Sequence, residues 1–189
     1  MMVEAPTIQR SHYEEYERLL KALHCLIAEG QGDGDEAEAI RDRMDEPWWS
    51  LTEAERKRLE GLSTDLDMLS DDEIWEADEG IEVDAWAADL RAARDSRDWE
   101  SVLAMLRKSP AGSLPQAPRA YLRALAYAAL GHEETSLLFA RHALALEPDN
   151  VWYRLLVIQQ LTRLDRRDDA LAEMATQADL SHAPVPRAD

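Results

Sequence analysis

The sequence predicts an all-α fold, and three observations support that prediction. Ala and Leu dominate the 189 residues, only one Phe is present, and β-branched residues are sparse. These preferences favour helix over sheet along almost the whole chain. A serine and a threonine are each followed three positions later by glutamate, a spacing that marks helix starts. From residue 83 onward, similar side chains recur at a fixed period, which is typical of stacked helical units.

The first predicted helix begins at a capping box formed by Ser11 and Glu14. We expect it to end at Gly30, because a glycine can adopt the left-handed conformation that closes many helices. Its apolar residues recur at the spacing of one helix face, which we expect to pack inward. That face comprises Tyr13, Tyr16, Leu20, Leu23 and Ile27, and is widened by Leu19 and Leu26.

A short second helix is predicted after the turn GQGDGD. Asp35 can cap this helix, which carries Ile40 inward and ends at about Met44. Pro47 is expected to block its continuation, because proline lacks the amide hydrogen that a helix interior needs.

A third helix is predicted to begin at a second capping box, formed by Thr52 and Glu55. Its leucines recur at helical spacing and form one apolar stripe. The first domain, residues 1–70, is therefore expected to be a small helical bundle. The stripe comprises Leu59, Leu62, Leu66 and Leu69.

The negative charge of the chain is concentrated in its middle. The net charge is −18, and the segment between Arg58 and Arg91 contains twelve acidic residues and no basic one. Residues 71–82 are expected to form an acidic linker with a short helix over 71–79. Such a surface repels nucleic acid and anionic membranes, so we expect neither as a direct partner. Two interpretations remain open for this segment, a solvated linker and a docking surface for a basic partner.

Three units with a common register follow, at residues 83–116, 117–150 and 151–179. Leu103, Leu137 and Leu171 illustrate the match, and no insertion is needed to keep the same spacing across all three units. Each unit is predicted to contain two helices, separated near residues 97, 131 and 165. The predicted helix pairs are 84–96 with 98–108, 118–130 with 133–146, and 151–164 with 167–179.

This pattern resembles the tetratricopeptide repeat, a family of 34-residue helix-turn-helix units. The resemblance is closest in the middle unit, where small, aromatic, turn and terminating residues fall at the family positions. It implies three stacked repeats that form a short right-handed α-solenoid. Arg123 and Asp89 depart from the family pattern, which usually has leucine at that position. The matching residues are Ala124, Tyr127, Gly131, Ser136, Ala143 and Pro148.

The resemblance also implies a concave groove, lined by the first helix of each pair, that holds a peptide or a partner helix. The Lys and Asn pattern with which some family members bind the acidic tails of heat-shock chaperones is missing, so that ligand is not expected. The repeat register places these residues on the groove: Arg91, Arg94, Tyr121, Leu125, Ala128, Trp152, Leu155, Gln159 and Arg163.

Tryptophans mark a second candidate surface. Trp86, Trp99 and Trp152 recur near helix starts, which favours packing roles, and one aromatic of the pair Trp152–Tyr153 is expected to pack on the preceding unit. For Trp48 and Trp49 we favour burial of both between bundle and repeats, and keep open that one is an exposed anchor. With the acidic segment they form a candidate partner surface: Trp48, Trp49, Asp71, Asp72, Glu73, Trp75 and Glu76.

No pattern in the sequence indicates catalysis. Nucleotide-binding glycine motifs, nucleophile motifs and zinc-type His spacings are lacking, so we expect no catalytic residue, cofactor or metal site. Cys25 falls on the polar side of the first helix near Arg18 and Lys21, and a single cysteine cannot form an internal disulfide.

The chain is expected to be a cytoplasmic, non-enzymatic adaptor that binds a protein partner, as a monomer or small homo-oligomer. Two alternatives are an acidic chaperone, inhibitor or immunity-type protein that shields a basic partner through residues 60–89, and a homo-oligomeric structural component. The last helix carries polar residues that suit a solvent-facing end, among them Asp168 and Glu173. Residues 180–189 are expected to be a disordered tail.

Overall fold

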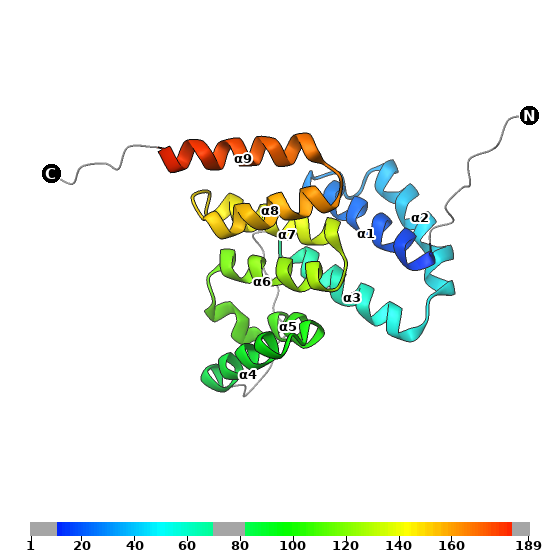
Figure 1. Cartoon of the computed structure of the whole chain (residues 1–189). Coiled ribbons are helices and arrows are strands. Elements are labelled where there is room, and N and C mark those ends of the chain that lie inside the picture. The colour runs from blue at the N-terminus through cyan, green and yellow to red at the C-terminus, as the bar shows by residue number, and fades with distance from the viewer. Residues whose placement is uncertain (1–10, 70–81, 183–189) are drawn as a thin grey trace, which may run out of the picture. The chain divides into compact units, whose positions relative to one another are not determined.

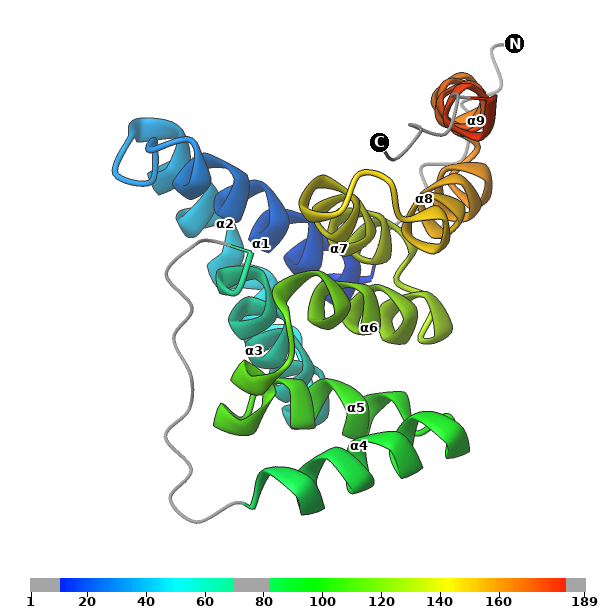
Figure 2. The same ribbon diagram turned by 90° about the vertical axis from the view of Figure 1, so that its left-hand side faces the viewer.

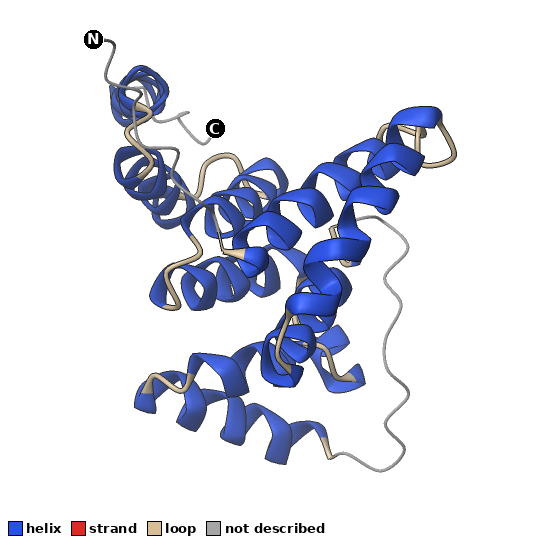
Figure 3. Cartoon of the chain, turned by 90° about the vertical axis from the view of Figure 1, so that its right-hand side faces the viewer, coloured by secondary structure: helices blue, strands red, loops and turns tan. Residues whose placement is uncertain are grey.

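The computed structural model describes residues 11–69 and 82–182, with side chains described as far as Thr176. Within these ranges the chain forms nine α-helices, one short 3-10 helix and no strand (Figure 3), which confirms the all-α prediction. Contacts divide the chain into two compact units, residues 1–74 and 75–189. The first unit contains α1 (His12–Ala28), α2 (Asp35–Ser50) and α3 (Glu53–Asp67).

Both predicted capping boxes of the first unit are formed. The backbone N–H of Glu14 donates to Oγ of Ser11 (3.2 Å), and the Ser11 N–H donates to the Glu14 carboxylate (3.1 Å). Thr52 and Glu55 exchange the equivalent bonds at 3.3 and 2.8 Å. Each pair satisfies two amide hydrogens that the first turn of a helix would otherwise leave unbonded. The starts of α1 and α3 are therefore confirmed.

The second helix is longer than predicted, and the expected stop at Pro47 is wrong. α2 continues to Ser50 with Pro47 inside it, and it begins after Gly34, with Asp35 as its first residue rather than its cap. Proline at this position removes a single hydrogen bond near the end of the helix. Its ring also continues the buried stripe of the helix. The buried residues of α2 are Ala37, Ile40, Met44 and Pro47.

The core of the first unit lies where α1 packs against α2 and α3. The largest fully buried side chains of this unit include Leu19, Leu59 and Leu66. The predicted α1 stripe is correct at Leu20 but wrong at Ile27, which is half exposed. Ile27 lies in the last turn of α1, where its side chain approaches Gly32 of the following connection. Apolar periodicity thus extends one turn beyond the packed part of this helix.

The described part of the second unit contains six α-helices, and each packs on the next one along the chain. Figures 1 and 2 show them side by side in chain order, with α4 and α9 at opposite ends. Every helix predicted for residues 83–179 is present, with boundaries no more than three residues from those expected, and the short helix predicted over 71–79 lies outside the described residues. A 3-10 helix, η1 (Ser109–Ser113), is an addition that the sequence pattern does not predict. The α-helices are α4 (Val83–Ser96), α5 (Trp99–Leu106), α6 (Gln116–Ala129), α7 (Glu133–Leu146), α8 (Val151–Arg163) and α9 (Arg167–His182).

The three turns inside the helix pairs share one backbone geometry. Arg97, Gly131 and Asp165 adopt left-handed conformations with φ of 61°, 84° and 56°. In each case the following N–H bonds to a carbonyl five residues back, at 2.9, 2.9 and 2.8 Å, from Asp98, His132 and Arg166 respectively. This is the Schellman arrangement, which satisfies carbonyls at a helix C-terminus. The turns fall at residues 97, 131 and 165, where the sequence analysis predicted the breaks inside the helix pairs.

In the first and the last helix pair, the two helices contact each other at the same two positions. The Trp86 indole N–H donates to the backbone carbonyl of Met105 at 3.2 Å. At the equivalent positions of the last helix pair, Arg154 of α8 and Glu173 of α9 form an ion pair at 2.7 Å. The two helices of the first and last pairs therefore meet at equivalent positions through different chemistry.

Arg123, which departs from the family pattern, is buried in the second unit. Its guanidinium donates to the carbonyl of Leu106 at 2.7 Å, close to the C-terminus of α5. A cation at that place stabilises the free carbonyls of the helix end. The small residue Ser136 is also buried and donates its hydroxyl to the Ala124 carbonyl (2.8 Å), so α7 approaches α6 closely.

The last helix is less polar on its outside than predicted. Leu171 is 62% exposed and Met174 is 51% exposed, whereas Leu137, at the corresponding place in α7, is 5% exposed. α8 packs on α7, whereas no described helix follows α9 to cover this side of it. α9 continues to His182, three residues beyond its predicted end, and residues 183–189 of the expected tail lie outside the described residues.

Candidate protein-binding faces

Helices α6 and α8 meet through two tyrosines. The rings of Tyr121 and Tyr153 are tilted by 36° with centroids 4.7 Å apart. Burial raises the pKa of both phenols, and at Tyr153 the negative charge of Glu147 raises it further. Tyr153 is therefore the aromatic of the Trp152–Tyr153 pair that packs on the preceding unit, as expected.

Trp152, the other member of the pair, points outward. The Asn150 side chain caps α8 by accepting a hydrogen bond from the Trp152 N–H at 3.1 Å, which fixes where the helix begins. Trp152 is 69% exposed and Leu155 is 45% exposed. The packing role favoured for Trp152 is therefore wrong, although Trp86 is buried. The reason is that Tyr153, Leu156 and Val157 already occupy the packed side of α8.

Seven of the predicted groove residues belong to these two helices, and we call them the α6–α8 face. Those on α6 are partly buried, and those on α8 are exposed. The tyrosine contact joins the two halves. The face comprises Tyr121, Leu125 and Ala128 of α6 with Trp152, Leu155, Gln159 and Arg163 of α8.

The other two predicted groove residues, Arg91 and Arg94, lie on α4, outside its buried side. Arg94 pairs with its neighbour Asp95 at 2.9 Å. Arg91 has no ion pair or hydrogen bond through its side chain within residues 11–69 and 82–182. The α4 helix packs on α5 and η1, and no described side-chain bond links these arginines to the α6–α8 face.

Trp48 and Trp49 have different environments, so the prediction that both are buried is wrong. Trp48 lies 5.2 Å from the ring of Tyr16, and the Arg56 guanidinium lies 5.6 Å from its ring centroid. Trp49 is 75% exposed. Because α2 passes through both residues, their side chains point about 100° apart, and only one can face α1. The other acidic-surface candidates, Asp71, Asp72, Glu73, Trp75 and Glu76, lie outside the described residues.

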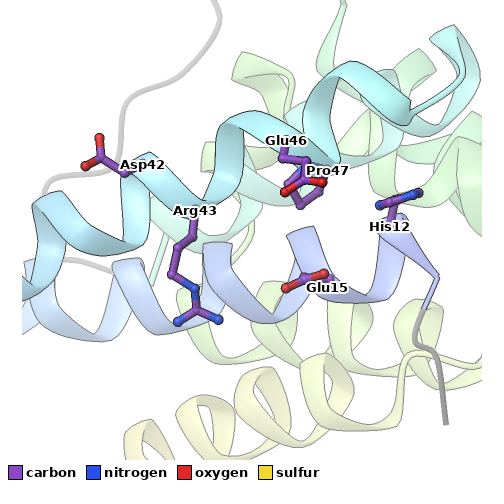
Figure 4. A pocket seen from close by; sticks show the side chains of 6 residues that line it. All are labelled: His12, Glu15, Asp42, Arg43, Glu46 and Pro47. Atoms are coloured by element: carbon purple, nitrogen blue, oxygen red, sulfur yellow. The ribbon is translucent and has the colours of Figure 1, made fainter. Parts of the chain in front are cut away.

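A cavity of about 320 Å³ lies between α1 and α2. Figure 4 shows Glu46 and Pro47 of α2 on one side and Glu15 of α1 on the other, with Asp42 at the margin. His12 and Arg43 complete the lining. None of the three carboxylates has a side-chain hydrogen bond or ion pair to another described residue. The sequence analysis missed this site, because it depends on the continuation of α2 through Pro47.

The described residues indicate no metal centre and no membrane span. No group of three or more His, Cys, Asp or Glu side chains within them could hold a metal ion. None of their helices has the length and apolar character needed to cross a bilayer. Cys25 is exposed on α1. Comparison with models of known protein families, with curated proteins and with solved structures finds no match.

Proposed function

We propose that the second unit is a short tetratricopeptide-like array that binds a protein partner through the α6–α8 face, with Arg91 and Arg94 of α4 as further candidate contacts. The recurring left-handed turns support the array, because Arg97, Gly131 and Asp165 share both their backbone conformation and their hydrogen bonds. In stacked helical repeats the side chains of one helix face remain available for ligands.

The observation that carries the binding role is the exposure of Trp152 and Leu155 on the outer side of α8. Exposed aromatic and aliphatic side chains that lie together are typical of protein-binding surfaces, and tryptophan often contributes most to their affinity. Tyr121 and Leu125 extend this apolar area onto α6. A scaffold role requires no chemistry at these residues, and the proposal is therefore non-enzymatic.

Affinity capture from native lysate, quantified by mass spectrometry, tests the proposal. We expect Trp152→Ala to reduce capture of the partner at least tenfold, since loss of a central tryptophan costs about 2 kcal/mol or more at many interfaces. Trp49→Ala is the matched control, because it also removes an exposed tryptophan but lies in the first unit. Equal capture by wild type and Trp152→Ala, at unchanged helicity, would reject the α6–α8 face.

Self-association is a second candidate function, and the exposed side of α9 supports it. Leu171 and Met174 are exposed, whereas Leu137 and Ala140, at the equivalent positions of α7, are buried in a helix that packs on both α6 and α8. A second copy that covers them would remove apolar surface from water. Light scattering over a concentration series tests this candidate. A mass that rises with concentration, and returns to the monomer value in Leu171→Glu, supports it; a monomer throughout excludes it.

A further inference from the structure

The second exposed tryptophan, Trp49, lies on an acidic side of α2. Trp49 shares this side with Asp42, two turns earlier, and with Asp45 and Glu46, about one turn earlier. All four residues are exposed, and we call them the Trp49 face. Its three carboxylates have no side-chain hydrogen bond or ion pair to any described residue, so their charges are available to a ligand.

We propose that the Trp49 face binds an arginine-bearing basic segment of a partner protein. The α1–α2 cavity adjoins this face, since Asp42 and Glu46 belong to both. Glu15 supplies a further carboxylate from α1, and Arg43 is the single arginine or lysine in the lining. A cationic side chain that enters the cavity would therefore meet several unpaired negative charges.

Trp48, which precedes Trp49 in α2, contacts an arginine, and this contact indicates which cation suits the Trp49 face. The Arg56 guanidinium lies 5.6 Å from the centroid of the Trp48 ring, and its Nε donates to the Trp48 carbonyl at 3.3 Å. A guanidinium is planar and weakly hydrated, so it stacks on tryptophan better than an ammonium group does. Trp49 offers the same ring surface to solvent, beside carboxylates that can pair with the same guanidinium.

The charge of the whole chain favours the same class of partner. A net charge of −18 attracts basic proteins over a distance set by the salt concentration. That attraction alone selects no particular face. The Trp49 face adds an aromatic ring and a cavity at one place, which gives a basic segment a defined docking position. This proposal is independent of the α6–α8 face, which lies in the other unit.

A peptide of alternating Arg and Ser, labelled with fluorescein, tests the proposal on the full chain. Binding is measured by fluorescence anisotropy at low and at physiological salt, against peptides with Lys or Gln in place of Arg. We expect the Arg peptide to bind best and the Gln peptide not to bind. Trp49→Ala should weaken Arg-peptide binding roughly two- to fivefold, the loss expected for one exposed cation–π contact.

Two control variants separate this face from diffuse charge attraction. Glu46→Gln should weaken binding more than Glu36→Gln, which removes the same charge from α2 at a point about 20 Å along the helix from Trp49. Trp152→Ala should leave peptide binding unchanged. The proposal is overturned if the Arg peptide fails to bind, if Trp49→Ala has no effect, or if both glutamate variants weaken binding equally. The partner capture described above, which depends on Trp152, reports separately on the α6–α8 face.

Discussion

The two units repeat their helix-end signals to different extents: among the described residues, the left-handed turn that closes α1 at Gly30 (φ 73°) occurs once in the first unit and three times in the second. In the first unit, each boundary has its own local signal, such as the capping boxes at Ser11 and Thr52. In the second unit, one turn geometry is used three times, at Arg97, Gly131 and Asp165. A local signal fixes one helix end, whereas a recurring turn also fixes which residues of successive helices are equivalent. The buried positions of the second unit can therefore be compared across helices, and those of the first unit cannot.

The largest expected effect tests this equivalence with one residue type at two equivalent positions. Leu137→Ala should lower the free energy of unfolding by about 3 kcal/mol, because the buried side chain leaves a cavity. Leu171→Ala should change it by less than about 0.5 kcal/mol, because the side chain is mostly exposed. Urea unfolding followed by circular dichroism measures both. Similar losses for the two variants would show that α9 is covered in solution.

The recurring turn can be tested by exchanging its residues. Gly131→Ala should destabilise the second unit by about 1–2 kcal/mol, the cost of a left-handed conformation for a residue with a Cβ. A Cβ at this position meets no atom within 4 Å, so the backbone conformation alone accounts for the loss. Arg97→Gly should instead stabilise the second unit, by a smaller amount, because glycine adopts the left-handed conformation without this cost. Hydrogen exchange of α4–α7 amides checks this, and a destabilised Arg97→Gly would contradict it.

Because the helix-end signals of the first unit are local, removing one of them should destabilise a single helix end. Thr52→Ala should cost about 1 kcal/mol, since it removes the cap of α3. Thr64→Ala is the matched control: its hydroxyl bonds to the Glu60 carbonyl of the same helix (3.1 Å), and alanine suits a helix interior. Amide exchange at the start of α3 should accelerate in the first variant alone. An equal acceleration of amide exchange in Thr64→Ala would show that loss of the capping box is not the cause.

The smallest expected effect is a pH dependence of the first unit. Burial of His24 lowers its pKa below the ordinary 6.5, and Asp67, 3.8 Å away, offsets this only in part. The unfolded chain therefore takes up this proton first as pH falls. Stability from neutral His24 is present above 6.5 and is lost as pH falls through the lower pKa of the folded state.

His24→Gln should remove this part of the pH dependence, and urea unfolding above and below pH 6.5 measures it. His12→Gln serves as the control, because His12 is exposed. The informative quantity is the difference in free energy of unfolding between wild type and His24→Gln at each pH, since other groups titrate in both proteins. A wild type that gains stability relative to His24→Gln on acidification would contradict the expected direction.

Sequence reasoning predicted most helix boundaries, because caps and a repeat register are local or periodic features. It failed where a distant group decides the outcome. Arg123 is buried because the Leu106 carbonyl accepts its hydrogen bond, and no spacing rule reveals that acceptor. Pro47 stays helical because it extends a buried stripe. That error also concealed the exposure of Trp49 and the cavity between α1 and α2.

The α6–α8 face was predicted only as a set of residues. The register assigned Tyr121 and Trp152 to one surface, but exposure depends on which neighbours cover each side chain. Tyr153 takes the packed position against Tyr121, and Trp152 is left outside. No sequence pattern distinguishes two adjacent aromatics in this way before the crossing of α6 and α8 is known.

The even spacing of the three left-handed turns bears on how the second unit can change in length. Each residue inserted into a helix rotates everything after it by about 100°, so a short insertion would turn buried side chains such as Leu161 toward solvent. An insertion or deletion of one whole period restores every side chain to an equivalent place. Under the proposed array, duplication of residues 117–150 is therefore the least disruptive route to a longer protein.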